Sequence, residues 1–146
     1  MEELRPKVGV GVMILKEGKI LLAKRIASHG AGSYAFPGGH LEHLESIFEC
    51  AKRETREEAG IEIENLRFLC ISNVALYLPK HYINIGILAD WMSGEPRLME
   101  QGKTEEWLWY SLDALPAPLF DAIPNYIRAY KGGDIFYDLK DNEGTA

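Results

Sequence analysis

An apolar run near the N-terminus, at residues 8–15, places the strongest constraint on how this chain folds. Its letters, VGVGVMIL, carry no charge, and a short apolar run bounded by turn residues is typical of a buried β-strand. A turn at residues 16–19 follows, and residues 20–24 predict the returning strand of a hairpin. The chain is therefore expected to start with a buried β-hairpin.

A helix with clear ends is predicted at residues 46–59. Ser46 and Glu49 have the S-x-x-E spacing of a capping box, and Gly60 stands where a helix commonly ends. The remaining expected elements are a short strand at 34–36, strands at 66–75, 82–89 and 106–110, a short capped helix at 111–115, and a helix at 120–130 that has Pro124 in its first turn or at a kink. Because strands and helices do not alternate strictly, the expected fold class is α/β of the α+β type, a mixed β-sheet sandwiched between α-helices.

The length of 146 residues predicts one domain over residues 1–146, with a core at about 7–130 and a C-terminal tail at 131–146. The net charge of -6 argues against a nucleic acid polymer as partner. No apolar run approaches the roughly 18 residues of a membrane helix, so no membrane partner is expected. The charged N-terminus and the two cysteines, which lack metal-type spacing, predict a cytoplasmic protein.

Three carboxylates share one face of the predicted helix. Glu54, Glu57 and Glu58 stand at i, i+3 and i+4, so their like charges repel within one turn. Two interpretations follow. The first is a solvated acidic face, which is the usual one for a Glu-rich helix. The second is a Mg²⁺ site that shares its ligand shell with substrate phosphates.

The surrounding spacing favours the second interpretation. The pattern G-x5-E-x7-R-E-U-x-E-E-x-G-U, in which U is usually apolar, matches the chain from Gly39 to Ile61, with Thr55 at a position that is usually apolar. This is the signature of the Nudix hydrolases, and the sequence resembles that family. The likeness covers residues 8 to about 125, and it extends to the MutT-like enzymes and most closely to the nucleotide triphosphate diphosphatases. It implies the Nudix fold.

The resemblance implies roles for specific residues. Glu54, Glu57 and Glu58 would be the catalytic and metal-binding carboxylates, joined by backbone ligands around Gly39. Glu57, or Glu100 in the later polar loop, could act as base. Arg53 would orient the carboxylates, and Glu45 would either pair with Arg53 or reach the metal. The residues expected to contact substrate are Arg25, Gly38, His40 and Phe120.

Two positions depart from the family pattern. Leu44 replaces a glycine that commonly precedes Glu45, so the loop is expected to avoid a positive φ there. Phe120 matches one of two neighbouring aromatic residues that the subfamily carries beside the base, but Asp121 occupies the place of the second.

The expected activity is Mg²⁺-dependent hydrolysis of a nucleoside or deoxynucleoside triphosphate to the monophosphate and pyrophosphate, with Mn²⁺ as an alternative ion. Water would attack a metal-bound phosphoanhydride. Three alternatives stay open: a pyrophosphatase for ADP-ribose or nucleotide sugars, one for dinucleoside polyphosphates, and a Nudix module that senses a nucleotide without turnover. The subfamily likeness also implies a homodimer.

Overall fold

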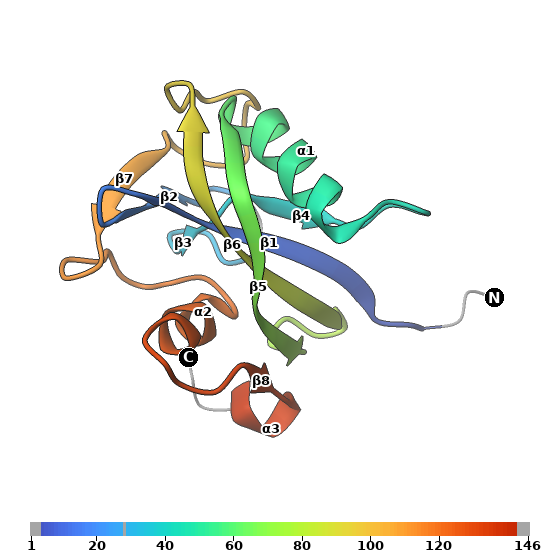
Figure 1. The fold of residues 1–146 in the computed structure, drawn as a ribbon. Coiled ribbons are helices and arrows are strands. Elements are labelled where there is room, and N and C mark those ends of the chain that lie inside the picture. Colours follow the sequence, from blue (N-terminus) through green and yellow to red (C-terminus); the bar gives the residue numbers. More distant parts are fainter. Residues whose placement is uncertain (1–3, 28, 143–146) are drawn as a thin grey trace.

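The computed structural model describes residues 4–27 and 29–142, and one twisted sheet runs through the centre of the molecule (Figure 1). In chain order the elements are β1 (Lys7–Lys16), β2 (Lys19–Lys24), β3 (Tyr34–Ala35), β4 (Gly38–His40), α1 (Ile47–Ala59), β5 (Glu62–Val74), β6 (Tyr82–Ser93), β7 (Leu108–Ser111), α2 (Ile123–Tyr130), β8 (Phe136–Tyr137) and α3 (Leu139–Asn142).

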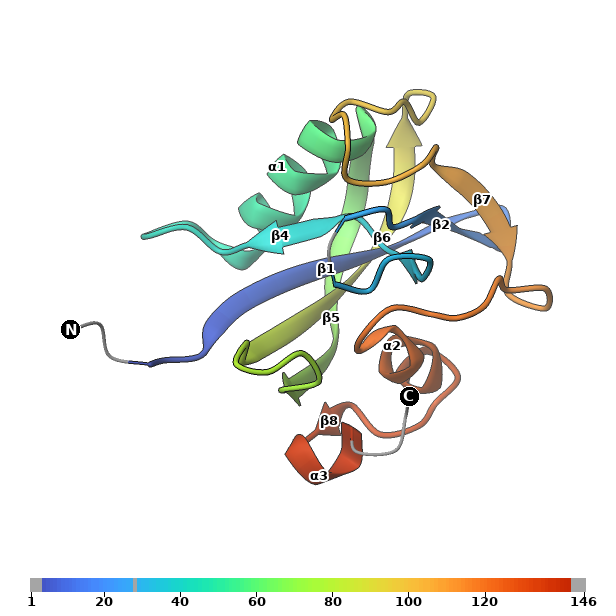
Figure 2. The same cartoon turned by 180° about the vertical axis from the view of Figure 1, so that it is seen from behind.

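The sheet is mixed, as the sequence predicts. Its main path runs β3-β2-β1-β6-β5-β8, with β4 paired to β1 and β7 paired to β2. The pairs β1–β6 and β5–β8 are parallel, and the other pairs are antiparallel. Figures 1 and 2 show α1 on one side of the sheet and α2 on the other, so the predicted sandwich is confirmed.

Strand β1 is central because its side chains are apolar on both faces. Val10, Val12 and Ile14 belong to the hydrophobic cluster beneath α1, whereas Met13 belongs to the cluster beneath α2. This alternation follows from the two-residue period of a strand. The predicted buried strand is therefore confirmed, and it separates the two cores.

A two-glycine slot in the sheet receives the side chain of Tyr126 from α2. Gly11 of β1 and Gly86 of β6 are register partners in the parallel pair. A Cβ atom on Gly11 would collide with the Tyr126 hydroxyl, and one on Gly86 would lie 3.0 Å from the Tyr126 ring. Because Tyr126 is almost fully buried, this slot fixes where α2 sits on the sheet.

Helix α1 begins and ends as predicted. The Ser46 side chain accepts a hydrogen bond from the Glu49 amide at 3.0 Å, and the Glu49 carboxylate accepts from the Ser46 amide at 3.4 Å. Gly60 ends the helix in the left-handed conformation, with φ 69°. Thr55 is fully buried, and its hydroxyl donates to the Ala51 carbonyl at 2.7 Å.

Two sequence-based expectations are wrong near the C-terminus. The short helix at 111–115 is absent from the described chain; a turn follows β7 there, and Pro116 prevents a helix from continuing. The last long helix starts at Ile123 rather than at 120, because Asp121 has a positive φ of 51°, which is not helical. Pro124 lies in its first turn, as one of the two predicted placements has it.

The segment after residue 130 holds more structure than a tail. Strand β8 pairs with β5 through Phe136 and Tyr137, and the short helix α3 follows. Residues 143–146, the end of the predicted tail, lie outside the described residues. Within the described residues, no helix is long and apolar enough to cross a membrane.

Candidate active site

The two glycines of β4 let the sheet approach α1 closely. A Cβ atom on Gly39 would collide with the Glu54 carboxylate, and one on Gly38 would collide with the Val10 carbonyl. The Gly38 amide donates a hydrogen bond of 2.7 Å to Oε1 of Glu58. The glycine-rich strand therefore brings backbone groups against two of the three predicted ligand carboxylates.

Arg53 organises the carboxylates along the same side of α1. Its Nε and Nη2 donate to the two Glu45 oxygens at 2.7 and 3.0 Å, and its Nη1 donates to Glu54 at 2.7 Å and to Glu57 at 3.2 Å. Its Nη2 also donates to the His40 carbonyl at 3.2 Å. The sequence left open whether Glu45 pairs with Arg53 or reaches the metal, and the structure shows the pair with Arg53. The planar guanidinium suits this role because it presents several fixed donors.

The electrostatics differ among these carboxylates. Hydrogen bonds from Arg53 lower the pKa of Glu45 to about 2. Burial raises the pKa of Glu54, although Arg53 opposes that shift. Burial raises the pKa of Glu58 to about 8; the Gly38 amide lowers it, and the charges of Glu54 and Glu100 raise it further. A desolvated, mutually repelling carboxylate pair favours a bound cation.

The donors present suit a hard divalent cation. Among the residues that the structure describes, no three His, Cys, Asp and Glu side chains are arranged as a ready-made ligand set. Arg53 and Gly38 instead hold the carboxylate oxygens. Oxygen-rich donors of this kind are those that Mg²⁺ and Mn²⁺ prefer. Because Gly39 has no side chain, its backbone lies close to the Glu54 carboxylate.

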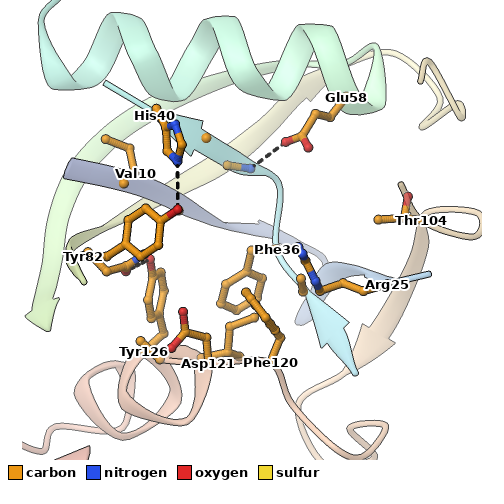
Figure 3. Close-up of a pocket in the computed structure, with 18 of the residues that line it drawn as sticks. Val10, Arg25, Phe36, His40, Glu58, Tyr82, Thr104, Phe120, Asp121 and Tyr126 are labelled. Carbon is orange, nitrogen blue, oxygen red and sulfur yellow. Dashed lines mark hydrogen bonds between the residues drawn. The ribbon is translucent and has the colours of Figure 1, made fainter. Parts of the chain in front are cut away.

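A cavity of about 370 Å³ opens beside this acidic region (Figure 3). Among the predicted residues, it is lined by Arg25, Gly38, Gly39, His40, Glu58 and Phe120. Glu45, Arg53, Glu54 and Glu57 do not line it. Glu45 lies in the loop before α1 and pairs with Arg53 on that helix, as Glu54 does, and the Glu57 side chain is about half exposed. Glu100, the other candidate base, forms an ion pair of 2.6 Å with Lys103.

At one wall of the cavity, a guanidinium lies over an aromatic ring. The Arg25 guanidinium is 4.1 Å from the centre of the Phe120 ring. Tyr77, which does not line the cavity, stacks on Phe120 with the two ring centroids 5.8 Å apart. Arg25 Nε donates to the His29 carbonyl at 3.3 Å. Burial lowers the pKa of Arg25 from its ordinary value. Because that ordinary value lies far above neutral pH, Arg25 stays a cation.

Several lining residues were not singled out from the sequence. Tyr82, Asn84 and Tyr126 form the wall beneath α2, where the Tyr126 hydroxyl donates to Asn84 and the His40 ring lies within 3.3 Å of the Tyr82 hydroxyl. A signal was available: Tyr82, Asn84 and Gly86 alternate with isoleucines, which predicts a polar face on that strand. The pairing with α2 is a long-range contact that no local pattern contains.

The expectation about Leu44 is wrong. Leu44 has φ 60° and is almost fully exposed, so the loop keeps the left-handed conformation even without glycine. The loop must turn there so that Glu45 can accept from the Glu42 amide at 3.1 Å and pair with Arg53.

Comparisons with known proteins identify a family for this chain. The NUDIX domain model matches residues 5–130. An ADP-ribose pyrophosphatase from Methanocaldococcus jannaschii is 34% identical over 134 residues, which cover 89% of this chain and 78% of that protein. A NAD-capped RNA hydrolase from Chromobacterium violaceum is 31% identical over 112 residues, covering 76% of this chain and 41% of its own length. The chain thus spans about two fifths of that relative.

The fold is also similar to that of a solved structure. The MutT NUDIX hydrolase from Burkholderia pseudomallei is 36% identical, with a TM-score of 0.80 over 85% of this chain and 97% of that one. This chain has the Nudix fold, a mixed sheet with few helices. The chain belongs to the Nudix hydrolase family.

Proposed function

We propose that this protein is a divalent-metal-dependent pyrophosphohydrolase that cleaves a nucleoside or deoxynucleoside triphosphate to the monophosphate and pyrophosphate. The observation that carries the proposal is the close approach of the Gly38–Gly39 backbone to Glu54 and Glu58 at the edge of a ligand-sized cavity. Cavities of a few hundred Å³ are typical of small-molecule sites. Family membership supports the same reaction class.

Glu54, Glu57, Glu58 and the Gly39 backbone would hold Mg²⁺, or Mn²⁺ in its place. When bound, the ion neutralises phosphoryl charge and acidifies a coordinated water. Arg53 keeps Glu54 and Glu57 oriented through the hydrogen bonds described above. The carboxylates of Glu57 and Glu100 are both exposed enough to take a proton from water, and the assignment of the base between them is left to kinetics on their variants.

The opposite wall would bind the rest of the substrate. Arg25 is a partly buried cation at the cavity, and it would pair with a phosphate. His40 and the Gly38 amide line the same side as Glu58 and would flank the phosphate chain. Phe120 presents a ring to the cavity and would stack on the base.

A substrate panel with product separation tests this proposal. Nucleoside and deoxynucleoside triphosphates, ADP-ribose, nucleotide sugars and dinucleoside polyphosphates are incubated with Mg²⁺, with Mn²⁺ and with a chelator. Metal-dependent release of a monophosphate and pyrophosphate from a triphosphate is the expected result. Release of single phosphate, or turnover in the chelator, contradicts it.

ADP-ribose is the second candidate substrate, because the Methanocaldococcus jannaschii relative that matches 89% of this chain is an ADP-ribose pyrophosphatase. Preference for ADP-ribose over every triphosphate would select it. Nucleotide binding without any turnover would instead identify a sensing module.

Two accompanying expectations stay predictions. A cytoplasmic location agrees with the free, buried thiols of Cys50 and Cys70. A homodimer is checked by light scattering, which should give a particle of twice the chain mass of 16.5 kDa.

A further inference from the structure

The side chain of Asp121 is a charged group in the cavity that the proposed reaction does not use. It stands just before α2, between Phe120 and Tyr126 at the cavity wall (Figure 3), while Glu58 lies on the α1 side. Its Oδ1 atom is buried and has no hydrogen-bond partner among the described residues. Burying a carboxylate oxygen without a hydrogen-bond partner is costly, so the presence of an aspartate here needs an explanation.

A structural role in α2 does not explain it. Acidic residues before a helix commonly cap it, but the N-cap residue of α2 is Ala122, and no side chain makes a capping hydrogen bond there. The positive φ of Asp121 is also no reason for a charge, because asparagine and glycine adopt it as readily.

The neighbouring donors are committed elsewhere. The Tyr126 hydroxyl donates to Asn84, and Arg25 donates through Nε to the His29 carbonyl while its guanidinium stacks on Phe120. Arg25 therefore acts on Asp121 through space only. The carboxylate remains an acceptor aimed into a cavity whose adjacent wall is the ring of Phe120.

A ligand with a flat ring that bears N–H groups fits the Phe120 ring and the neighbouring Asp121 carboxylate. Aromatic side chains stack on a base and carry no sequence preference, whereas a carboxylate accepts hydrogen bonds and repels ring atoms that also accept. Asp and Glu select exocyclic amino groups on nucleobases for this reason. The terminal torsion of Asp is broad, so either oxygen can turn to the ligand.

We propose that Asp121 is a specificity-determining residue that accepts a hydrogen bond from an amino group on the nucleobase of the substrate. The inference rests on the proposed function, since it takes the cavity to be the nucleotide site. Among the purines, amino groups occur on guanine and on adenine, and the arrangement favours either of these over a purine that lacks one at the same edge.

Two nucleotide pairs isolate the amino group. GTP and ITP differ only by the 2-amino group, and ATP and purine riboside triphosphate differ only by the 6-amino group. The wild-type enzyme should prefer the amino-bearing member of one pair by about tenfold or more in kcat/KM, as expected for a hydrogen bond to a charged acceptor. The pair that shows the preference identifies the edge that faces Asp121.

Asp121→Asn removes the charge with little change in shape and suits the same φ. It should lower the preference to about twofold, mainly through KM, because the Asn amide oxygen still accepts a hydrogen bond but is a neutral and weaker acceptor. Asp113→Asn, an exposed aspartate on a turn, is the matched control and should keep the wild-type preference. No preference in either pair for the wild type, or an equal change of both members in Asp121→Asn, overturns the assignment.

Failure of the proposed function gives a different result. If no triphosphate is hydrolysed, the same four nucleotides are compared by the thermal shift they give the protein. A larger shift for the amino-bearing member in the wild type, lost in Asp121→Asn, supports the role of Asp121 without the reaction. Equal shifts within both pairs contradict it.

Discussion

The two sides of the cavity differ in how their residues are distributed along the sequence. The α1 side comes from one continuous stretch, residues 38–60, in which Gly39, Glu54 and Glu58 meet across a short loop. The α2 side combines Arg25, Tyr82 and Phe120, which are far apart in the chain. The first side can therefore be recognised as a spacing, whereas the second exists only once the sheet has brought three segments together.

This contrast also separates chemistry from selectivity. The α1 side carries the carboxylates that suit a metal, and the α2 side carries rings, an arginine and one unpaired carboxylate. Changes on the α1 side should abolish turnover for every substrate, and changes on the α2 side should alter which substrate is turned over. The following predictions test that division.

Glu58→Gln should give the largest effect, a loss of about 10²–10³-fold in kcat for all substrates, because an anionic ligand is lost where phosphoryl charge is stabilised. The amide still accepts from Gly38, so the fold should persist, as circular dichroism would show. Glu64→Gln, at an exposed position on β5, is the control and should behave as wild type. Turnover in Glu58→Gln at the wild-type rate would remove Glu58 from the metal site.

Arg53→Lys should weaken metal binding by about 10–100-fold, because lysine keeps the charge but cannot hold Glu45 and Glu54 together. The measurement is the Mg²⁺ concentration that gives half-maximal rate. Arg56→Lys, at an exposed arginine that pairs with Glu62, should leave that concentration unchanged. Equal effects of the two substitutions would show that Arg53 has no particular role.

Asp121 should make stability fall as the pH rises from about 4 to 6. Burial raises its pKa from 3.8 to about 6, with Arg25 opposing the shift and with Tyr77 and Tyr126 as the other titratable groups that sense its charge. The folded state then binds more protons than the unfolded state in this window, so stability present at low pH is lost as the carboxylate ionises. The expected loss is about 2 kcal/mol.

Denaturant unfolding of the wild type and of Asp121→Asn at pH 4 and pH 7 measures this. Between pH 4 and pH 7, the unfolding free energy of the wild type should fall by about 2 kcal/mol relative to that of Asp121→Asn. Parallel pH profiles would show that Asp121 is well solvated, and the α2 side of the cavity would then lack its buried charge.

Leu44→Gly should give the smallest effect, a gain of about 1 kcal/mol in the free energy of unfolding, because glycine adopts φ 60° without the penalty of a side chain. Leu44→Ala keeps that penalty, so it should match the wild type. A gain of the same size in both variants would trace the effect to the exposed leucine side chain instead of the backbone. The rate should change in neither, since Leu44 does not line the cavity.

The sequence predicted local features well. The capping box at Ser46 and Glu49, the end of α1 at Gly60 and the buried strand around Val10 depend on neighbours within a few residues, and all three are confirmed. The helix at 111–115 failed for a local reason as well, because a single turn satisfies the same capping pattern before Pro116.

The features that could not be predicted from the sequence depend on residues that are distant in the chain. The burial of Asp121 is set by Phe120, Tyr126 and Arg25 together, and a lone aspartate next to a phenylalanine carries no sign of it. Leu44 shows the same limit in the backbone: its φ follows from the position that Arg53 imposes on Glu45. The roles of the individual site residues stay predictions until the variants are measured.

The glycine slot in the sheet bears on how rigid the selective wall is. Helix α2 has only eight residues and would not persist in isolation. Tyr126 anchors it between Gly11 and Gly86 at the centre of the sheet, where partial detachment would open a hole in the core. The amides of α2 therefore belong to the same cooperative unfolding unit as β1 and β6, and their hydrogen exchange should follow global opening. A wall held in this way selects its ligand by a fixed shape.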